Sequence, residues 1–294
     1  MRIVQLVALS CTVAIKSSTL GTMTITKAII PVAGWGTRRL PITKSIEKCM
    51  LPIGNRPIVD YVVKDCIAAG IKDIYFVVSE ESTQIQAYYG DNGALNTYLI
   101  ANGKEEWLPA VAPPRNVNFH YIIQNTLGKY GTAVPVSLVF SKLHPGESIV
   151  YLGGDDCIYN SDGSSEVARL IAATPENGNA MLGANVPREI VGRYGVLQLN
   201  ERNEFVRIVE KPRPEEAPST LINISKYVLN YDVLRAITEY VDVPVSGEYY
   251  ITEPINQYVL GGGSVKVVEA QGTYLDSGTL QGWLHANNVV CADL

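Results

Sequence analysis

Two apolar runs on either side of a helical segment constrain the fold of this chain most strongly. Residues 26–34, TKAIIPVAG, and residues 72–80, KDIYFVVSE, are nearly continuous apolar runs, as in strands that are buried on both faces. Residues 57–70 space their apolar side chains as a helix does, begin with proline and end with glycine. The pattern predicts a β-loop-α-β unit, the building block of a parallel sheet.

The rest of the first half repeats this alternation. Residues 116–124 and 148–154 are further strand candidates, and residues 131–143 between them form a helix candidate with Pro135 in its first turn. We therefore predict an α/β fold with a Rossmann-like mixed, mostly parallel sheet flanked by helices. Residues 23–177 are expected to form its nucleotide-binding part.

The pattern changes after about residue 178, where short strands separated by turns replace the alternation. The strand candidates are 179–186, 193–200, 204–212, 221–230 and 264–270, and the helix candidates are 231–241, 250–263 and 280–290. We expect residues 178–294 to be a smaller, β-rich part of one domain that spans residues 23–294.

Composition limits the classes of function. A chain of 294 residues with 47% hydrophobic and 18% charged residues is an ordinary globular protein with a large core. Its net charge of −5 argues against a general nucleic-acid binder. The five scattered cysteines lack the spacing of a zinc site or a disulfide framework, which fits a reducing cytoplasm. We expect a cytoplasmic protein with neither membrane nor nucleic acid as a partner.

The first residues have a separate interpretation. Residues 1–22 contain a short apolar run after Arg2 that looks like a secretory signal but is too short to span a bilayer. We expect translation to start at Met23, so that residues 1–22 are an upstream extension. A chain that begins at Met23 should then be as active and as soluble as the full chain.

One glycine-punctuated loop concentrates positive charge in this acidic chain. The segment GWGTRRLPITKSIEKCMLP, residues 34–52, contains Arg38, Arg39, Lys44 and Lys48. It follows a predicted buried strand, at the edge of the sheet where α/β proteins bind ligands, and its glycines let backbone amides approach an anion. The spacing lacks the G-K-[ST] of a P-loop and the third glycine of a dinucleotide fingerprint. The loop therefore predicts an anion site of a different kind.

The longer stretch GWGTRRLPITKSIEKCMLPIGNRPIVDYVV resembles the G-x-G-T-R-(x)n-P-x-T-K-x-x-x-K-x-[ML]-x-P signature of sugar-1-phosphate nucleotidyltransferases. Its LPITKSIEKCMLP form is most similar to the branch that uses UTP and glucose 1-phosphate. The resemblance covers residues 28–290 and implies that UTP and glucose 1-phosphate are converted to UDP-glucose and pyrophosphate. It also implies a nucleotidyltransferase-type domain in which residues 178–294 are the sugar-binding part. The alternatives are a thymidylyltransferase that acts on glucose 1-phosphate and a non-catalytic homologue that senses nucleotide sugars.

The resemblance assigns roles within the loop. It implies that the segment with Ala33, Gly34 and Gly36 holds the nucleotide, that Arg38 grips the triphosphate, and that Lys48 contacts phosphates at the reacting centre. Positioned positive charge is what phosphoryl-group transfer chiefly needs. For the two other cations, Arg39 and Lys44, we favour roles at the surface or in support of the site, with Lys44 also a candidate phosphate contact.

A second nucleotide segment is YIIQNTLGKYGTAV. The resemblance implies that Gln124 and a glycine read the pyrimidine edge, and the Gln124 amide has both a donor and an acceptor to match uracil. Relatives usually have glycine where this chain has Lys129, so Gly131 and Gly128 compete for the second role; we favour Gly131.

The metal candidates are aspartates. VYLGGDDCIYN matches the G-D-N-x-x-Y pattern of the family, which makes Asp155 the magnesium ligand and leaves Asp156 as its neighbour, although either could bind the ion. TYLDSGT resembles W-x-D-x-G-T and gives Asp276 as the second ligand. Two carboxylates with substrate phosphates and water suit Mg²⁺, so Mg²⁺ is the expected cofactor.

The sugar site is expected in RYGVLQLN and RIVEKPRP, which resemble the Y-G-V and V-E-K-P segments of the family. Gly195 would let the backbone approach a sugar hydroxyl, Glu210 would accept hydrogen bonds from hydroxyls, and Lys211 would bind the sugar phosphate. The family also implies a homodimer or homotetramer.

Overall fold

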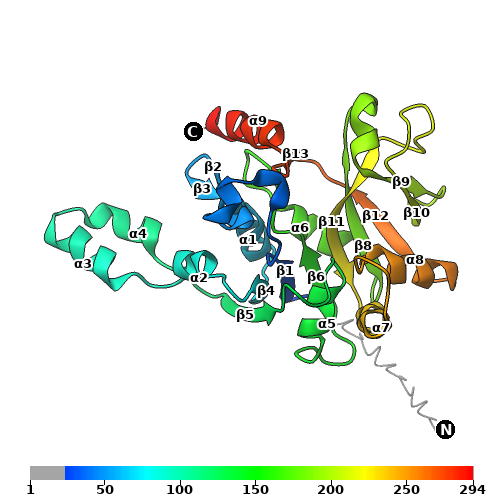
Figure 1. The fold of residues 1–294 in the computed structure, drawn as a ribbon, viewed down its shortest axis with the longest axis horizontal. Helices are drawn as coiled ribbons and strands as arrows, with labels where there is room; N and C mark the ends of the chain where they lie inside the picture. Colours follow the sequence, from blue (N-terminus) through cyan, green and yellow to red (C-terminus); the bar gives the residue numbers. More distant parts are fainter. Residues whose placement is uncertain (1–23, 294) are drawn as a thin grey trace, which may run out of the picture.

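The computed structural model describes residues 24–293, and a mixed sheet forms their centre (Figure 1). Its strands are β1 (Lys27–Pro31), β4 (Asp73–Ser79), β5 (Asn118–Gln124), β6 (Ile149–Leu152), β8 (Asn179–Asn185), β9 (Gly195–Leu199), β10 (Phe205–Glu210), β11 (Leu221–Leu229) and β12 (Val265–Glu269). They run in the order β10-β9-β11-β6-β1-β4-β5, and β8 and β12 branch from β11.

The direction of the strands divides the sheet. β6, β1, β4 and β5 are parallel neighbours, as the β-loop-α-β pattern predicts. β11 pairs antiparallel with β6, β8 and β9, and β9 pairs antiparallel with β10. The predicted mostly parallel first part and β-rich second part are therefore both present, and one continuous sheet runs through them.

Helices cover both faces of the sheet. The helices are α1 (Ile58–Ala68), α2 (Gln84–Tyr89), α3 (Gly93–Ala101), α4 (Leu108–Val111), α5 (Val134–Phe140), α6 (Glu166–Ala173), α7 (Tyr231–Asp242), α8 (Thr252–Leu260) and α9 (Leu280–Cys291). One hydrophobic core contains residues of α1, α2, α6 and α9, and the other contains residues of α5, α7 and α8. Successive strand residues point to opposite faces, so Ile30 of β1 belongs to the first core and Ile29 to the second.

Two short ribbons lie outside the central sheet. β2 (Pro52–Ile53) pairs with β3 (Arg56–Pro57) directly after the cationic loop. β7 (Asp156–Tyr159) pairs antiparallel with β13 (Thr273–Asp276), which joins two segments more than a hundred residues apart. The sequence patterns did not predict either ribbon.

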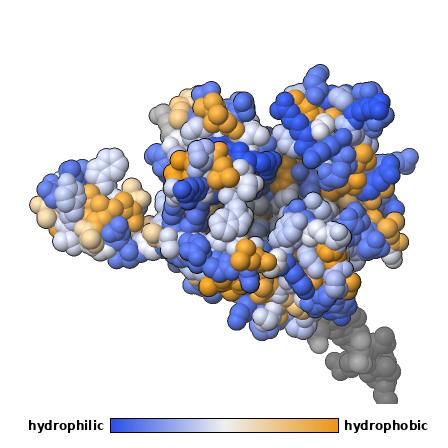
Figure 2. Space-filling model, in the orientation of Figure 1, coloured by the Kyte–Doolittle hydropathy of each residue, from blue (hydrophilic) through white to orange (hydrophobic). Residues whose placement is uncertain are grey.

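The sequence also gave no signal for an arm formed by α3 and α4. In Figure 1 this arm extends away from the sheet, and Figure 2 shows apolar residues among the polar ones on it. Tyr98, Ile100 and Trp107 of the arm are all more than half exposed. α3 lacks a clear apolar stripe because its sequence, GALNTYLIA, is apolar on most sides, so helical periodicity could not reveal it.

Three further expectations concern the start of the chain, membrane spans and the division of the domain. The start at Met23 and the upstream extension, residues 1–22, lie outside the described residues. Among residues 24–293 there is no helix whose length and apolar character would let it cross a membrane. The division of the domain near residue 177 stays a prediction.

Burial on both faces of β1 gives a direct test of this architecture. Ile29 and Ile30 are adjacent and fully buried, so each replacement by alanine should lower the free energy of unfolding by about 2–5 kcal/mol. A sheet with one solvent face would show that loss for one of the two alone. Ile123→Ala, on β5 with 62% of the residue exposed, is the control and should change little in urea denaturation.

Candidate active site

A cleft of about 1400 Å³ lies at the carboxyl ends of the parallel strands. Pockets for small ligands are commonly 300–1,000 Å³, so this volume suits a nucleotide together with a second substrate. Nine of the predicted site residues line the cleft: Ala33, Gly34, Gly36, Arg38, Lys48, Gln124, Gly131, Asp155 and Asp276. The structure thus gathers residues from four separate stretches of sequence.

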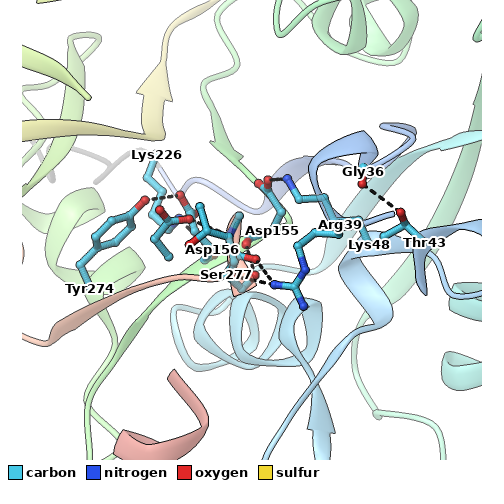
Figure 3. Close-up of polar contacts among 12 residues, drawn as sticks. Gly36, Arg39, Thr43, Lys48, Asp155, Asp156, Lys226, Tyr274 and Ser277 are labelled. Atoms are coloured by element: carbon cyan, nitrogen blue, oxygen red, sulfur yellow. Dashed lines mark hydrogen bonds and ion pairs between the residues drawn. The ribbon is translucent and has the colours of Figure 1, made fainter. Parts of the chain in front are cut away.

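The cationic loop folds as three short 3₁₀ turns, Thr37–Arg39, Ile42–Lys44 and Lys48–Met50. Gly36 has φ 63°, and a Cβ there would lie 3.0 Å from the Cβ of Lys48. The Thr43 hydroxyl donates to the Gly36 carbonyl at 2.9 Å (Figure 3). Glycine is therefore required at 36 both by its backbone conformation and by the close approach of Lys48.

Glu47 anchors the end of the loop next to Lys48. Its carboxylate accepts hydrogen bonds from the Ser82 hydroxyl at 2.8 Å and from the backbone N–H groups of Thr83 and Gln84 at 2.9 and 2.8 Å. These amides belong to the start of α2, where a helix favours negative charge. The contact fixes the backbone that presents Lys48 to the cleft.

Arg39 ties the loop to the C-terminal part of the chain. It is 6% exposed, so the expected surface role is wrong and the expected supporting role fits. Its guanidinium donates to the carbonyls of Ser277 and Thr279 at 2.9 and 2.8 Å and lies 5.4 Å from the centre of the Trp283 ring. Because Ser277 follows Asp276 directly, Arg39 joins the loop to the segment of the second metal candidate.

The β7–β13 ribbon brings the candidate metal ligands together. Asp276 lies opposite Asp156 in the ladder, and the Ser277 hydroxyl donates to the backbone carbonyl of Asp155 at 2.7 Å. Asp276 accepts from the Gly278 N–H at 2.7 Å and from the Tyr194 hydroxyl at 3.4 Å. Asp155 and Asp276 thus occupy neighbouring positions on the wall of the cleft.

Cations face these carboxylates. Lys48 forms an ion pair with Asp155, and the Asp155 side chain is 42% exposed. Burial opposes the charge of Asp155, but the Lys48 ammonium, together with the more distant Lys226 and Arg38, holds the pKa of Asp155 below its ordinary value. The Arg38 guanidinium lies close by, since a Cβ at Gly278 would be 3.3 Å from Arg38 Nη2 and 2.9 Å from Asp276 Oδ1. A glycine at 278 keeps this space open.

Another wall of the cleft contains the segment that is expected to read the base, residues 124–131. Gln124 is 8% exposed and its Nε2 reaches the Lys129 carbonyl at 3.5 Å, whereas the Lys129 ammonium donates to the Val241 carbonyl at 2.6 Å. Gly131 has φ 124°, and a Cβ there would lie 2.4 Å from the Tyr249 carbonyl. Glycine at 131 therefore lets this segment pair with the one around Tyr249.

The competing candidates lie outside the wall of the cleft. Neither Gly128 nor Lys44 is among the lining residues. A Cβ at Gly128 would meet the Asn125 carbonyl at 3.4 Å, so this glycine has no comparable steric reason. The geometry favours Gly131 and Lys48 over these alternatives.

The sugar candidates lie together beside the cleft. Gly195 is opposite Glu210 in the β9–β10 ladder, and a Cβ at Gly195 would lie 2.9 Å from Glu210 Oε1. The Lys211 N–H donates to the Tyr194 carbonyl at 3.0 Å. Tyr194 lines the cleft, whereas Gly195, Glu210 and Lys211 are not lining residues. The three candidates therefore lie close to one another, and their neighbour Tyr194 connects them to the cleft.

Comparison with known proteins decides the family. Residues 27–293 match the family model described as nucleotidyl transferase. The chain belongs to the nucleotidyl transferase family. A relative from Methanocaldococcus jannaschii, provisionally named a UTP–glucose-1-phosphate uridylyltransferase, is 36% identical over 92% of this chain and 94% of its own length.

Two further comparisons agree. A UTP–glucose-1-phosphate uridylyltransferase from Mycoplasma pneumoniae is 31% identical over 90% of this chain and 91% of its own length. The solved structure of a UTP-bound UGPase from Acinetobacter baumannii superposes with a TM-score of 0.79 at 26% identity, covering 90% of this chain and 93% of that one. These matches confirm the predicted fold class and the family resemblance.

Sequence reasoning missed the surroundings of Asp156 in this nucleotidyl transferase. Lys226 of β11 is 3% exposed and forms an ion pair with Asp156, and the Tyr274 hydroxyl donates to Asp156 Oδ2 at 3.0 Å (Figure 3). Burial raises the pKa of Asp156, and the Lys226 ammonium opposes that shift. A lysine inside the apolar strand LINISKYVLN was the available signal, because a buried lysine requires a partner.

The carboxylates of the cleft are the candidate ligands for Mg²⁺. Within residues 24–293 there is no group of three or more His, Cys, Asp and Glu side chains that could hold a metal by itself. Asp155 and Asp276 supply two carboxylates on the wall of a cleft that also presents Arg38 and Lys48. Mg²⁺ is commonly bound by one or two carboxylates with substrate phosphates, so this donor set fits Mg²⁺ in the presence of a nucleotide.

Proposed function

We propose that this chain transfers the uridylyl group of UTP to glucose 1-phosphate, giving UDP-glucose and pyrophosphate. The observation that carries the proposal is that the loop cations Arg38 and Lys48 line a cleft of about 1400 Å³ together with two carboxylates, one of them paired with Lys48. The names of the relatives that are 31–36% identical over about nine-tenths of the chain support the choice of substrates.

The reaction needs one bond to form and one to break. A phosphate oxygen of glucose 1-phosphate attacks the α-phosphorus of UTP in line. The bond from that phosphorus to the bridging oxygen of the β-phosphate breaks, and its electron pair leaves on pyrophosphate. Such transfers need little covalent help from the protein, so positioning and positive charge do most of the catalysis.

Each proposed residue has one task in this scheme. The backbone around Ala33, Gly34 and Gly36 receives the nucleotide, and Gln124 reads uracil with Gly131 beside it. Arg38 holds the triphosphate, and Lys48 stabilises negative charge that develops at the α-phosphate. Glu210 accepts hydrogen bonds from sugar hydroxyls near Gly195, and Lys211 binds the sugar phosphate.

Mg²⁺ is the proposed cofactor. Asp155 and Asp276 would hold it, and when bound it neutralises phosphate charge as a Lewis acid. Asp156 is the weaker candidate because both of its oxygens already have partners, in Lys226 and Tyr274. The more exposed Asp155 carboxylate is the better placed of the two neighbours.

We also propose that the chain works in the cytoplasm as a homodimer or homotetramer. The five cysteines fit a reducing compartment. The arm supports self-association, because short helices with exposed Tyr98, Ile100 and Trp107 gain stability from packing against a partner.

The substrate assignment is tested by pyrophosphate release across a matrix of nucleoside triphosphates and sugar 1-phosphates. UTP with glucose 1-phosphate should give the highest kcat/KM, since the TKSIEKCMLP form of the signature loop favours the uridylyl branch. A clear preference for dTTP would replace the assignment with the thymidylyl alternative, and absence of turnover in every cell of the matrix would favour the sensing alternative.

Replacing each of the two lysines that are proposed to contact phosphates should change a different kinetic constant. Lys48→Ala should lower kcat ~10²-fold or more, because Lys48 acts on charge that develops in the transition state. Lys211→Ala should chiefly raise KM for glucose 1-phosphate and leave KM for UTP nearly unchanged. Lys44→Ala, in the same loop but away from the cleft wall, is the control. A normal kcat for Lys48→Ala would refute the catalytic role of the loop.

The metal assignment predicts a paired defect. Asp155→Asn and Asp276→Asn should each lower kcat and raise the Mg²⁺ concentration needed for half-maximal turnover by ~10-fold or more, because each removes a charged ligand. Asp242→Asn, at the exposed end of α7, is the matched control. A normal Mg²⁺ titration for either active-site variant would remove that residue from the ligand set.

A further inference from the structure

We propose that Lys226 is a positioning residue that, through Asp156, holds the β7–β13 ribbon with its two metal-binding carboxylates in register with the central sheet. The inference rests on the proposed function, since it concerns how Asp155 and Asp276 are presented. It assigns a task to a charge pair that the proposed reaction scheme leaves without one.

The pair is deeply placed and fully satisfied. The Lys226 side chain is 4% exposed and that of Asp156 is 15% exposed. The Lys226 ammonium also lies 3.4 Å from the backbone carbonyl of Asp156 and 3.5 Å from that of Ile224. Tyr274, on the other strand of the ribbon, donates to the second oxygen of the Asp156 carboxylate at 3.0 Å. Both strands of the ribbon therefore meet at this carboxylate.

The ribbon needs such a tether because two strands alone are marginally stable. Its far end is held by the buried carboxylate of Glu166, which accepts from the N–H groups of Gln271 and Gly272 at 2.9 Å each. At the end nearest the cleft, Lys226 provides the side-chain link from β11 of the central sheet to the ribbon. The proposed metal carboxylates lie at that same end.

The backbone of β11 supports this placement. The pairing of β11 with β8 is irregular between Asn223 and Lys226, and Ser225 has φ 51°. The Ser225 carbonyl accepts from the Gly153 N–H at 3.0 Å, two residues before Asp155. The bulge and the ion pair thus hold the turn at residues 153–156 from two sides. The backbone of Ser225 binds Gly153, and the side chain of Lys226 binds Asp156.

Single and double substitutions can show whether the ribbon depends on the charges of this pair or only on its packing. Removing one partner leaves the other as an unpaired buried charge, whereas replacing both with neutral groups of similar size is often tolerated. Methionine and lysine have similar length, and asparagine keeps the shape of aspartate. Lys226→Met should therefore be harmful and the double variant Lys226→Met with Asp156→Asn should recover.

The decisive measurement is hydrogen–deuterium exchange of the free protein over residues 273–277, which needs no substrate. Lys226→Met should raise the exchange rate there ~10-fold or more, and the double variant should return to within ~3-fold of the original chain. Lys266→Met, on an exposed position of β12, is the matched control and should change nothing. Unchanged exchange in Lys226→Met would overturn the proposal.

A second readout reports on the metal site. Binding of Mn²⁺ in the presence of UTP, followed by the electron paramagnetic resonance of free Mn²⁺, should weaken ~10-fold in Lys226→Met and recover in the double variant. Lower thermal stability with normal Mn²⁺ binding would reduce Lys226 to a structural residue. A double variant as defective as the single one would also reject the charge-pair explanation.

The role of Lys226 can be tested independently of the proposed function. If the substrate matrix gives no turnover, hydrogen exchange still reports whether Lys226 holds the ribbon. If Lys226→Met does not fold, Asp156→Asn alone takes its place, because it leaves Lys226 unpaired in the same way. A difference between Asp156→Asn and the double variant in exchange over residues 273–277 then supports the proposal, and equal exchange overturns it.

Discussion

Two adjacent aspartates at the end of a buried strand require compensating positive charge, and much of this site follows from that requirement. Asp155 is paired with Lys48 from the signature loop, and Asp156 is paired with Lys226 from the central sheet. The two carboxylates respond differently: the pKa of Asp155 is lowered, because Lys48, Lys226 and Arg38 together outweigh burial, and the pKa of Asp156 is raised, because burial prevails. Both carboxylates line the cleft, but that of Asp155 is the more exposed, and that of Asp156 is held by Lys226 and Tyr274.

These pairs also explain how distant segments are held together. The loop is fixed at one end by Glu47, which binds the start of α2, and at the other by Arg39, which binds the backbone after Asp276. The β7–β13 ribbon is fixed at its two ends by Glu166 and Lys226. In each case a buried or half-buried charged side chain binds backbone groups or an opposite charge, so its removal would leave polar groups unsatisfied.

The sequence predicted those features that local pattern determines. The buried strands, the longer helices and the glycine-rich loop have periodicity or special backbone needs, as at Gly36. Features that depend on tertiary contact were out of reach: the ribbon joins residues more than a hundred positions apart, α3 lacks an apolar stripe, and Arg39 looks like any loop cation. Even Gly131 has a steric reason, the nearby Tyr249 backbone, that no local pattern contains.

The lysines show why residue type alone does not assign a role. Lys44 is outside the cleft wall, Lys226 is buried with Asp156, and Lys129 caps the carbonyl of Val241. Lys48 differs from them because its partner is itself accessible: the Asp155 side chain is 42% exposed, whereas that of Asp156 is 15% exposed and both of its oxygens already have partners. In the proposed scheme, an incoming triphosphate competes with Asp155 for Lys48. Substrate binding would then rearrange the Lys48–Asp155 pair, while the Lys226–Asp156 pair stays in place beneath it.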